Sequence, residues 1–293
     1  MVATLSLGHS PDPDDAFMWW PLVGIDGAPP PVASPRLRFE CVAEDIELLN
    51  RKAEKGELDI TAISCAHYPR VAERYVLTAC GASVGDGYGP RLVSGARTTP
   101  QAIVDSAGVV AVPGERTTAF LVASLLMGPG AFRYEVVPFD RIIAEVAAGR
   151  FAAGVVIHEG QLTFEESGLV LVEDLGRWWR GRTGLPLPLG ANVVRRDLDA
   201  RFGAGTRDEV VALLERSVAH ALDHRATSIA YAHRFARDMD IATADEFVRL
   251  YVNHWTLDCG PRGRAAVERL LAEAADAGLA PRVAVDMIGS MQA

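Results

Sequence analysis

The chain has 293 residues, of which 49% are hydrophobic and 23% charged, and it carries a formal net charge of −9. This composition is ordinary for a globular protein and provides enough apolar material for two modest domains or one large one. The acidic balance, without any cluster of basic residues, argues against a protein that binds nucleic acid.

The N-terminal segment lacks the features of an export signal. Residues 1–15 contain no basic start followed by a long apolar stretch, and no apolar run reaches the ~20 residues that a membrane span needs. We therefore expect a cytoplasmic protein that does not bind a membrane. The cysteines form no CxxC pair, which favours buried, reduced thiols over a zinc or redox site. Disulfides between them remain an alternative. The four cysteines are Cys41, Cys65, Cys80 and Cys259.

Short apolar strands alternate with helices in the first part of the chain. Strands are predicted at residues 4–8, 36–42 and 58–63, and helices at residues 16–23 and 46–55. Alternating strands and helices joined by short Gly- or Pro-containing connections are typical of an α/β fold. We expect a largely parallel, doubly wound sheet.

A second α/β unit is predicted to begin near residue 98. Its strands are expected at residues 108–112, 134–138 and 152–157, and its helices at residues 119–127 and 140–148. The unit spans roughly ninety residues, which lies within the usual range of a domain.

The remainder of the chain is predicted to be mainly helical, with amphipathic helices at residues 208–223, 226–238, 244–256 and 261–277. Residues 83–97 and 185–197 flank the middle unit and are interpreted as two crossings between lobes. We therefore expect a discontinuous larger α/β lobe and a smaller inserted one, with a ligand-binding cleft between them. The larger lobe would comprise residues 1–93 and 191–293, and the smaller lobe residues 94–190.

His158 is the first candidate for chemistry because it follows the apolar strand at residues 152–157. In open α/β sheets, ligands bind beyond the carboxyl ends of the strands. A histidine in that place can act as an acid or base near neutral pH, although a packing or capping histidine is the alternative. As a base it must be neutral, and burial would favour that form. Glu159 could orient the imidazole, but we expect it to face solvent.

Residues 112–119 form the second candidate, a Val-Pro-Gly-Glu-Arg-Thr-Thr-Ala segment that joins a strand to the start of a helix. Free backbone N–H groups and the helix dipole suit a carboxylate or phosphate there, and the hydroxyls of Thr117 and Thr118 would add donors. The segment lacks the Gly-Lys-Ser/Thr ending of a Walker A loop. The alternative is an ordinary threonine cap that binds no ligand.

Residues 8–17 form the third candidate, again directly after a strand. Their three aspartates lack the spacing of a calcium loop, so we expect no metal here and interpret them as helix caps and first-turn charges. His9 is a rival to His158 as the catalytic histidine. Ser64 follows another strand and lacks a GxSxG context, which indicates a binding role and not a nucleophile. Trp178 and Trp179 could line a pocket for a flat ring or belong to the core.

Five segments carry a resemblance to a known family: Gly8-His9-Ser10-Pro11, residues 45–51 (Asp-Ile-Glu-Leu-Leu-Asn-Arg), residues 112–119, Ile157-His158-Glu159, and residues 182–190 (Arg-Thr-Gly-Leu-Pro-Leu-Pro-Leu-Gly). In this order and spacing they resemble the 1,4-dihydroxy-6-naphthoate synthases of the futalosine route to menaquinone. The resemblance covers the chain from Leu5 to about Leu279.

The resemblance implies a fold like that of the type II periplasmic binding proteins. It also implies a lyase that converts cyclic dehypoxanthine futalosine, a small-molecule carboxylate, into 1,4-dihydroxy-6-naphthoate without a cofactor. The family's catalytic base falls on His158. The substrate-binding candidates are Ser10, Ala62, Ile63, Ser64, Thr117, Thr118 and Ala119, of which Ala62 to Ser64, Thr118 and Ala119 match substrate-contacting positions of the family.

Two departures from the family pattern leave the exact substrate open. Residues 10–17 read Ser-Pro-Asp-Pro-Asp-Asp-Ala-Phe, where family members carry Ser-Pro-Cys-Pro-Asn-Asp-Thr-Phe, and Ala62 stands where they tend to carry a lysine. The alternatives are a cytoplasmic solute-binding or sensor protein of the same fold and the sister enzyme that dehydrates chorismate. The sequence does not indicate an oligomeric state.

Overall fold

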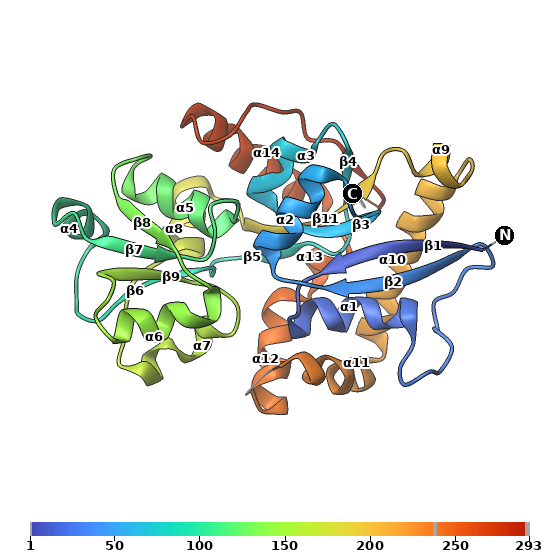
Figure 1. The fold of residues 1–293 in the computed structure, drawn as a ribbon, viewed down its shortest axis with the longest axis horizontal. Helices are drawn as coiled ribbons and strands as arrows, with labels where there is room; N and C mark the ends of the chain where they lie inside the picture. The colour runs from blue at the N-terminus through green and yellow to red at the C-terminus, as the bar shows by residue number, and fades with distance from the viewer. Residues whose placement is uncertain (1, 237–238, 291–293) are drawn as a thin grey trace.

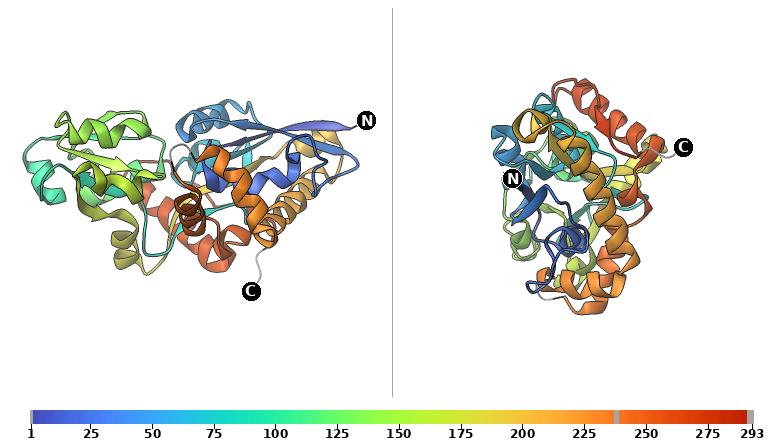
Figure 2. Two further views of the ribbon diagram at one scale, coloured as in Figure 1. Left: turned by 90° about the horizontal axis from the view of Figure 1, so that it is seen from below. Right: turned by 90° about the vertical axis from the view of Figure 1, so that its right-hand side faces the viewer.

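The computed structural model describes residues 2–236 and 239–290. Two β-sheets, each covered by helices, lie side by side, with the second sheet on the left of Figure 1 and the first on the right. The view from below in Figure 2 again separates the two units. Within the described residues, no helix is both long and apolar enough to cross a membrane.

The first sheet has the strand order β12-β4-β11-β3-β1-β2, with β5 paired to β11. Its strands are β1 (Ala3–His9), β2 (Leu37–Ala43), β3 (Ile60–Ser64), β4 (Tyr75–Thr78), β5 (Ser83–Gly85), β11 (Leu187–Arg195) and β12 (Met287–Ile288). β1 runs parallel to β2 and β3, as expected for this α/β alternation, and β12 runs parallel to β4.

β11 departs from the predicted parallel arrangement. Residues 185–197 were expected to be a connection, but residues 187–195 form a strand that pairs antiparallel with β3, β4 and β5. The chain returns to the first sheet through this strand. Its first residues, Leu-Pro-Leu-Gly, contain proline and glycine, which are typical of a connection, so the sequence did not indicate a strand. The first sheet is therefore mixed, and the prediction of a largely parallel sheet is wrong at this strand.

The second sheet has the order β10-β6-β9-β7-β8. Its strands are β6 (Arg91–Ser94), β7 (Val109–Val112), β8 (Arg133–Val136), β9 (Ala153–Val156) and β10 (Val170–Asp174). β7 is parallel to β8 and β9, whereas β6 is antiparallel to β9 and β10. The three strands predicted for this unit are confirmed as β7, β8 and β9.

The helices cover both sheets. In chain order they are α1 (Pro13–Val23), α2 (Ile46–Lys55), α3 (Tyr68–Val71), α4 (Pro100–Asp105), α5 (Thr118–Met127), α6 (Ile142–Ala147), α7 (Gly160–Thr163), α8 (Leu175–Thr183), α9 (Leu198–Phe202), α10 (Thr206–Asp223), α11 (Arg225–Ala232), α12 (Ile241–Tyr251), α13 (His254–Leu257) and α14 (Gly260–Asp276). In Figure 1, α4 to α8 surround the second sheet and the other helices the first.

Local sequence explains where several helices begin and end. α2 starts at the cap residue Asp45, whose carboxylate accepts from the Glu47 amide, and ends at Gly56 in the left-handed conformation. α1 begins at Pro13, earlier than the predicted residue 16, because proline suits the first helical position. Phe139–Arg141 precede α6 as a 3-10 turn.

The predicted helices at residues 226–238 and 244–256 are both shorter than expected. α11 ends at Ala232 and is followed by a 3-10 turn over His233–Phe235, while residues 237–238 lie outside the described part. Asn253 interrupts the second helix, since its side chain caps α13 in a reciprocal arrangement with Thr256.

The chain passes between the two sheets after β5 and again before β11, within or next to the predicted crossings. Gly176, at the start of α8, lies against the first crossing: a Cβ there would stand 1.9 Å from the backbone oxygen of Tyr88. Only glycine permits this approach. The division at residues 94 and 190 stays a prediction.

Candidate functional site

One pocket lies where the two units meet, and the residues assigned to the site from sequence gather there. Its lining includes Ser10, Ala62, Ile63, Ser64, Thr117, Thr118, Ala119 and His158. These residues come from the ends of β1, β3 and β9 and from the start of α5, which is where an α/β fold places its ligands. The residues that the sequence singled out therefore lie around one pocket.

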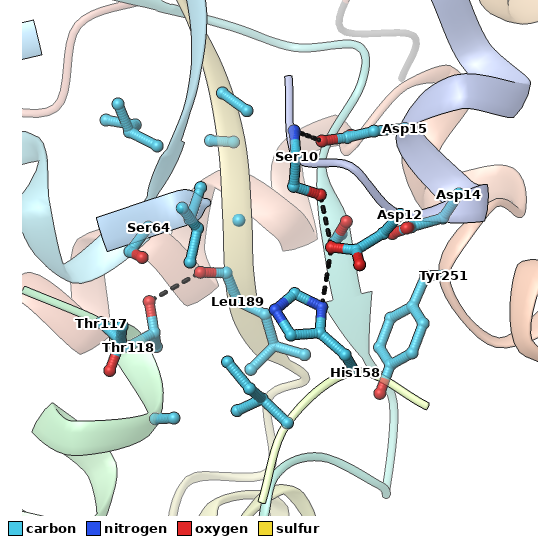
Figure 3. A pocket seen from close by; sticks show the side chains of 18 of the residues that line it. Ser10, Asp12, Asp14, Asp15, Ser64, Thr117, Thr118, His158, Leu189 and Tyr251 are labelled. Atoms are coloured by element: carbon cyan, nitrogen blue, oxygen red, sulfur yellow. Dashed lines mark hydrogen bonds and ion pairs between the residues drawn. The ribbon is translucent and has the colours of Figure 1, made fainter. Parts of the chain in front are cut away.

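His158 enters the pocket just beyond β9. Its backbone φ is +55°, a left-handed conformation that residues other than glycine seldom adopt and that is often found at functional sites. Its ring packs against Phe139 with the ring centroids 4.5 Å apart. Its Nδ1 lies 2.9 Å from the Oδ2 atom of Asp12, a carboxylate from the opposite unit (Figure 3).

Asp12 was interpreted from sequence as a helix cap, and this interpretation is wrong. Asp12 is the residue at the cap position of α1, but its side chain makes no capping hydrogen bond. Instead, its carboxylate is 1% exposed, accepts a 2.6 Å hydrogen bond from the Ser10 hydroxyl, and pairs with His158. The sequence could not reveal this pair, because the two residues lie in different units.

The pair reverses the expected charge state of His158. Burial is the largest influence on the imidazole and lowers its pKa. The charge and hydrogen bond of Asp12, with smaller effects from Glu159 and Asp14, oppose burial and raise the pKa of His158 to about 9. The expectation that burial keeps His158 neutral is therefore wrong for this arrangement. Glu159 is half-buried and does not fully face solvent.

Asp14 and Asp15 also line the pocket, and neither acts as a simple surface charge. Burial, followed by the neighbouring carboxylates, raises the pKa of Asp14 well above its usual value, and burial likewise raises that of Asp15. The Oδ1 atom of Asp14 is buried without a hydrogen-bond partner in the structure, whereas Asp15 accepts a 2.7 Å bond from the Ser10 amide. The side of the pocket next to His158 is therefore acidic.

The shift of His158 predicts that the protein loses stability as the pH rises from about 6.5 to about 9. His158 holds its proton to about pH 9 when folded but only to about 6.5 when unfolded, so its contribution is complete below pH 6.5 and is lost toward pH 9. The raised pKa values of Asp14 and Asp15 act in the same direction.

The measurement is the free energy of unfolding by denaturant at pH 6.5 and at pH 8.5. The His158→Asn variant is measured in the same way, so that the contribution of other titrating groups can be subtracted. The free energy of unfolding should fall less between the two pH values in the variant than in the wild-type protein. Equal declines in both proteins would contradict a shifted His158.

Ser64 is held on the opposite side of the pocket by a side chain whose role the sequence did not show. The Ser64 amide donates to Oδ1 of Asn50 at 3.0 Å, and Nδ2 of Asn50 donates to the Ser64 hydroxyl at 3.1 Å. Asn50 is fully buried. Because the hydroxyl accepts from Asn50, its own proton is available for a ligand oxygen.

At the start of α5, backbone amides remain available as donors to a ligand, but the two threonine hydroxyls do not. Thr117 Oγ1 accepts from the Phe120 amide and donates to the Gly114 carbonyl, and Thr118 Oγ1 donates to the Leu189 carbonyl at 2.6 Å. Both hydroxyl protons are therefore engaged within the protein. The cap leaves the backbone amides of Thr118 and Ala119, the first two of the helix, for an outside acceptor.

Two further contacts join the units around the pocket. Arg116 pairs with Glu47 and Glu54 of α2, at 3.0 and 2.9 Å, and its amide also donates to Glu47. The Tyr251 hydroxyl of α12 donates to Oε1 of Gln161 at 2.9 Å. Together with the Asp12–His158 pair, these contacts join the two units on either side of the pocket.

The remaining candidates do not form part of the pocket. His9 is buried, its Nδ1 lies 2.7 Å from the Ser10 carbonyl, and its ring meets Phe235 edge-on. Trp179 is fully buried and donates to the Pro186 carbonyl, so the core interpretation holds for it.

All four cysteines are free thiols. Over residues 2–236 and 239–290, no group of three or more His, Cys, Asp or Glu side chains could hold a metal ion.

Comparisons with solved structures confirm the two-lobed fold. A crystal structure of a protein from Archaeoglobus fulgidus superposes with a TM-score of 0.85 at 37% identity, covering 94% of this chain and 98% of the other. The alkanesulfonate-binding protein from Xanthomonas axonopodis pv. citri gives a TM-score of 0.64 at 13% identity over 97% and 96% of the chains. This second likeness shows the periplasmic-binding-protein fold alone.

Comparisons of sequence identify the family. Two curated relatives are named 1,4-dihydroxy-6-naphthoate synthase. That from Thermus thermophilus is 43% identical over 95% of this chain and 97% of its own length, and that from Streptomyces coelicolor is 36% identical over 97% and 98%. The model of the menaquinone biosynthesis family matches residues 5–276. The chain therefore belongs to the menaquinone biosynthesis family.

Proposed function

We propose that this protein is a 1,4-dihydroxy-6-naphthoate synthase, a lyase that converts cyclic dehypoxanthine futalosine into 1,4-dihydroxy-6-naphthoate. The observation that carries the proposal is the placement of His158 in a pocket between the two units, across from the Ser64 hydroxyl and the free amides of α5. The family and the names of its relatives support the same activity.

The pocket provides a separate place for each part of such a reaction. The amides of Thr118 and Ala119 and the positive end of α5 would hold the substrate carboxylate. Ser64, with Ala62 and Ile63 beside it on β3, would contact the rest of the molecule. Ser10 and Thr117 act mainly through the protein, since their hydroxyl protons are engaged with Asp12 and Gly114.

In its neutral form, whose share grows as the pH approaches about 9, His158 would remove a proton from the carbon next to the substrate's ketone. The electrons of the broken C–H bond pass into the substrate as an enolate. The enolate then expels the sugar-derived fragment, which leaves with the electrons of its bond and takes the proton back from the His158 imidazolium, so that the product is aromatic and His158 is neutral again. Proton transfer and elimination require no external oxidant or reductant, so we propose that the enzyme needs no cofactor. Closure of the two units would exclude water from the enolate.

The proposal also covers the domain organisation of the protein and its location in the cell. We propose a smaller lobe of residues 94–190 inserted into a larger lobe of residues 1–93 and 191–293, acting as a cytoplasmic enzyme. The second sheet, which begins with β6 at Arg91, and the return of the chain to the first sheet through β11 at Leu187 support an inserted lobe with boundaries close to these.

The deciding experiment incubates purified protein with cyclic dehypoxanthine futalosine and detects 1,4-dihydroxy-6-naphthoate by mass spectrometry. A parallel incubation with chorismate tests the sister dehydratase. Tight binding of the first compound without product would favour the solute-binding alternative. Product from chorismate alone would replace the proposal with the dehydratase.

Ser64→Ala is expected to raise KM by about five- to tenfold, because one hydrogen bond to the substrate contributes about 1 kcal/mol. kcat should change less than KM, since the serine is not placed to move a proton. Steady-state kinetics measure both constants. Ser106→Ala, the same change at the exposed residue that follows α4, is the control and should leave both constants unchanged. A loss confined to kcat would show that Ser64 is not a binding residue.

A further inference from the structure

The carboxylate of Asp12 spans the pocket from one unit to the other. It belongs to the connection between β1 and α1, whereas His158 follows β9 in the second sheet. Figure 3 shows its Oδ2 atom between the Ser10 hydroxyl and the imidazole, at the 2.6 and 2.9 Å given above. A nearly fully buried carboxylate in this place forms a hydrogen-bonded chain from Ser10 through Asp12 to His158.

This orientation is not required by the helix that Asp12 precedes. A residue at the cap position normally turns its side chain back onto the amides of the first turn, but the carboxylate of Asp12 makes no such bond. It is directed instead at Nδ1 of His158. Since the family pattern carries a cysteine at this position, the resemblance assigns Asp12 no role.

We propose that Asp12 is a positioning residue for the reaction, which holds Nδ1–H of His158 so that Nε2 faces the substrate. The proposal rests on the proposed function for its chemical step. Figure 3 shows the second ring nitrogen pointing away from Asp12, toward the side of the pocket where Ser64 and Thr118 lie. In the neutral form, an imidazole that donates through Nδ1 to a carboxylate has Nε2 free as an acceptor, and this is the form that acts as the base.

The proton balance follows from this geometry. The substrate C–H proton moves to Nε2, and its electron pair stays on the substrate carbon as the enolate. The ring becomes an imidazolium, whose Nδ1–H remains hydrogen-bonded to the Asp12 carboxylate. Asp12 therefore stays ionised throughout and stabilises the positive charge that forms on His158.

The charges around His158 determine how the rate should depend on pH. Asp12 and Asp14 face the ring from the start of α1, and Glu159 adjoins it in the chain. Tyr251 of α12 lines the same pocket, and burial raises its pKa, so it stays neutral over the working range. Because Asp12 supplies the largest effect that raises the pKa of His158, the rate should rise with pH toward about 9, and removing that charge should move the rise to lower pH.

The test is Asp12→Asn, studied by kinetics and by an NMR titration of the His158 ring without substrate. We expect the plateau of kcat to fall by about tenfold or more, because the ring loses its fixed tautomer. KM should stay within about twofold, and both the rise in rate and the titration should move down by at least about one pH unit. Asp197→Asn is the matched control: it removes a carboxylate paired with Arg195 outside the pocket and should alter none of these properties.

Two results would overturn the inference: an unchanged titration of His158 in Asp12→Asn, or an unchanged pH profile with only a loss of stability. If that variant does not fold, the wild-type titration decides, since a value near 9 supports the pair and a value near 6.5 refutes it. The titration needs no turnover. A wild-type protein that yields no naphthoate would overturn the proposed function, whereas an unshifted titration would overturn the role of Asp12.

Discussion

Replacing His158 with asparagine is expected to lower kcat by about a hundredfold or more, the usual contribution of a positioned base. Asparagine is the suitable replacement because it tolerates the left-handed backbone at φ +55° better than other side chains without a titratable group. Its amide can also bond to the Asp12 carboxylate, so that this buried charge keeps a partner. The fold should therefore survive while the base is lost.

Substrate affinity separates a catalytic role from a binding role in this variant. Ser64 and the amides of α5 do not depend on the imidazole, so the dissociation constant of the substrate should change by less than about threefold, within the variation of a single weak contact. Calorimetry on the inactive variant measures it directly. Near-wild-type turnover would remove His158 from the mechanism, and loss of folding would support a structural role for it.

Asn50→Ala is expected to be the second most damaging change, and its effect should appear in both stability and KM. Removal of the amide leaves the buried Ser64 N–H without its acceptor and the Ser64 hydroxyl without its donor. Each buried group left unsatisfied costs about 1–3 kcal/mol, so the free energy of unfolding should fall by roughly 2–4 kcal/mol. KM should rise by more than in Ser64→Ala, because the serine loses its orientation as well as its support.

A matched control distinguishes this effect from general destabilisation. Asn253→Ala makes the same substitution at the cap of α13, outside the pocket, and should cost about 1 kcal/mol without altering KM. Denaturant unfolding and steady-state kinetics compare the two variants. If Asn50→Ala lowers stability but leaves KM unchanged, Asn50 supports only the fold and not the orientation of Ser64.

The His158→Asn and Asp12→Asn variants together test whether Asp12 acts through His158. The His158→Asn variant retains the carboxylate and removes the base, whereas Asp12→Asn retains the base and removes the carboxylate. If the pair acts as one unit, the kcat loss of the double variant should be close to that of His158→Asn alone and well below the product of the two single losses. Independent, multiplicative losses would show that Asp12 does not act through His158.

The sequence by itself determined the local structure of this protein. Short apolar runs predicted β1, β7 and β9, and the spacing of apolar residues predicted a helix at residues 46–55, which α2 matches. The strand before His158 and the threonine cap before α5 could be recognised because strand periodicity and capping depend on neighbouring residues. The place of the pocket followed from these same elements, since strand ends are where such folds bind ligands.

Only the tertiary structure decided the chemistry of the site. The sequence did not predict β11, because its antiparallel pairing depends on strands far away in the chain. The sequence assigned Asp12 to a helix cap, and folding placed it against His158. Burial of that imidazole alone would have lowered its pKa, whereas the carboxylate brought from the other unit raises it. The sign of that shift depends on distances across the pocket, because charge interactions are set by separation in space and not by position along the chain.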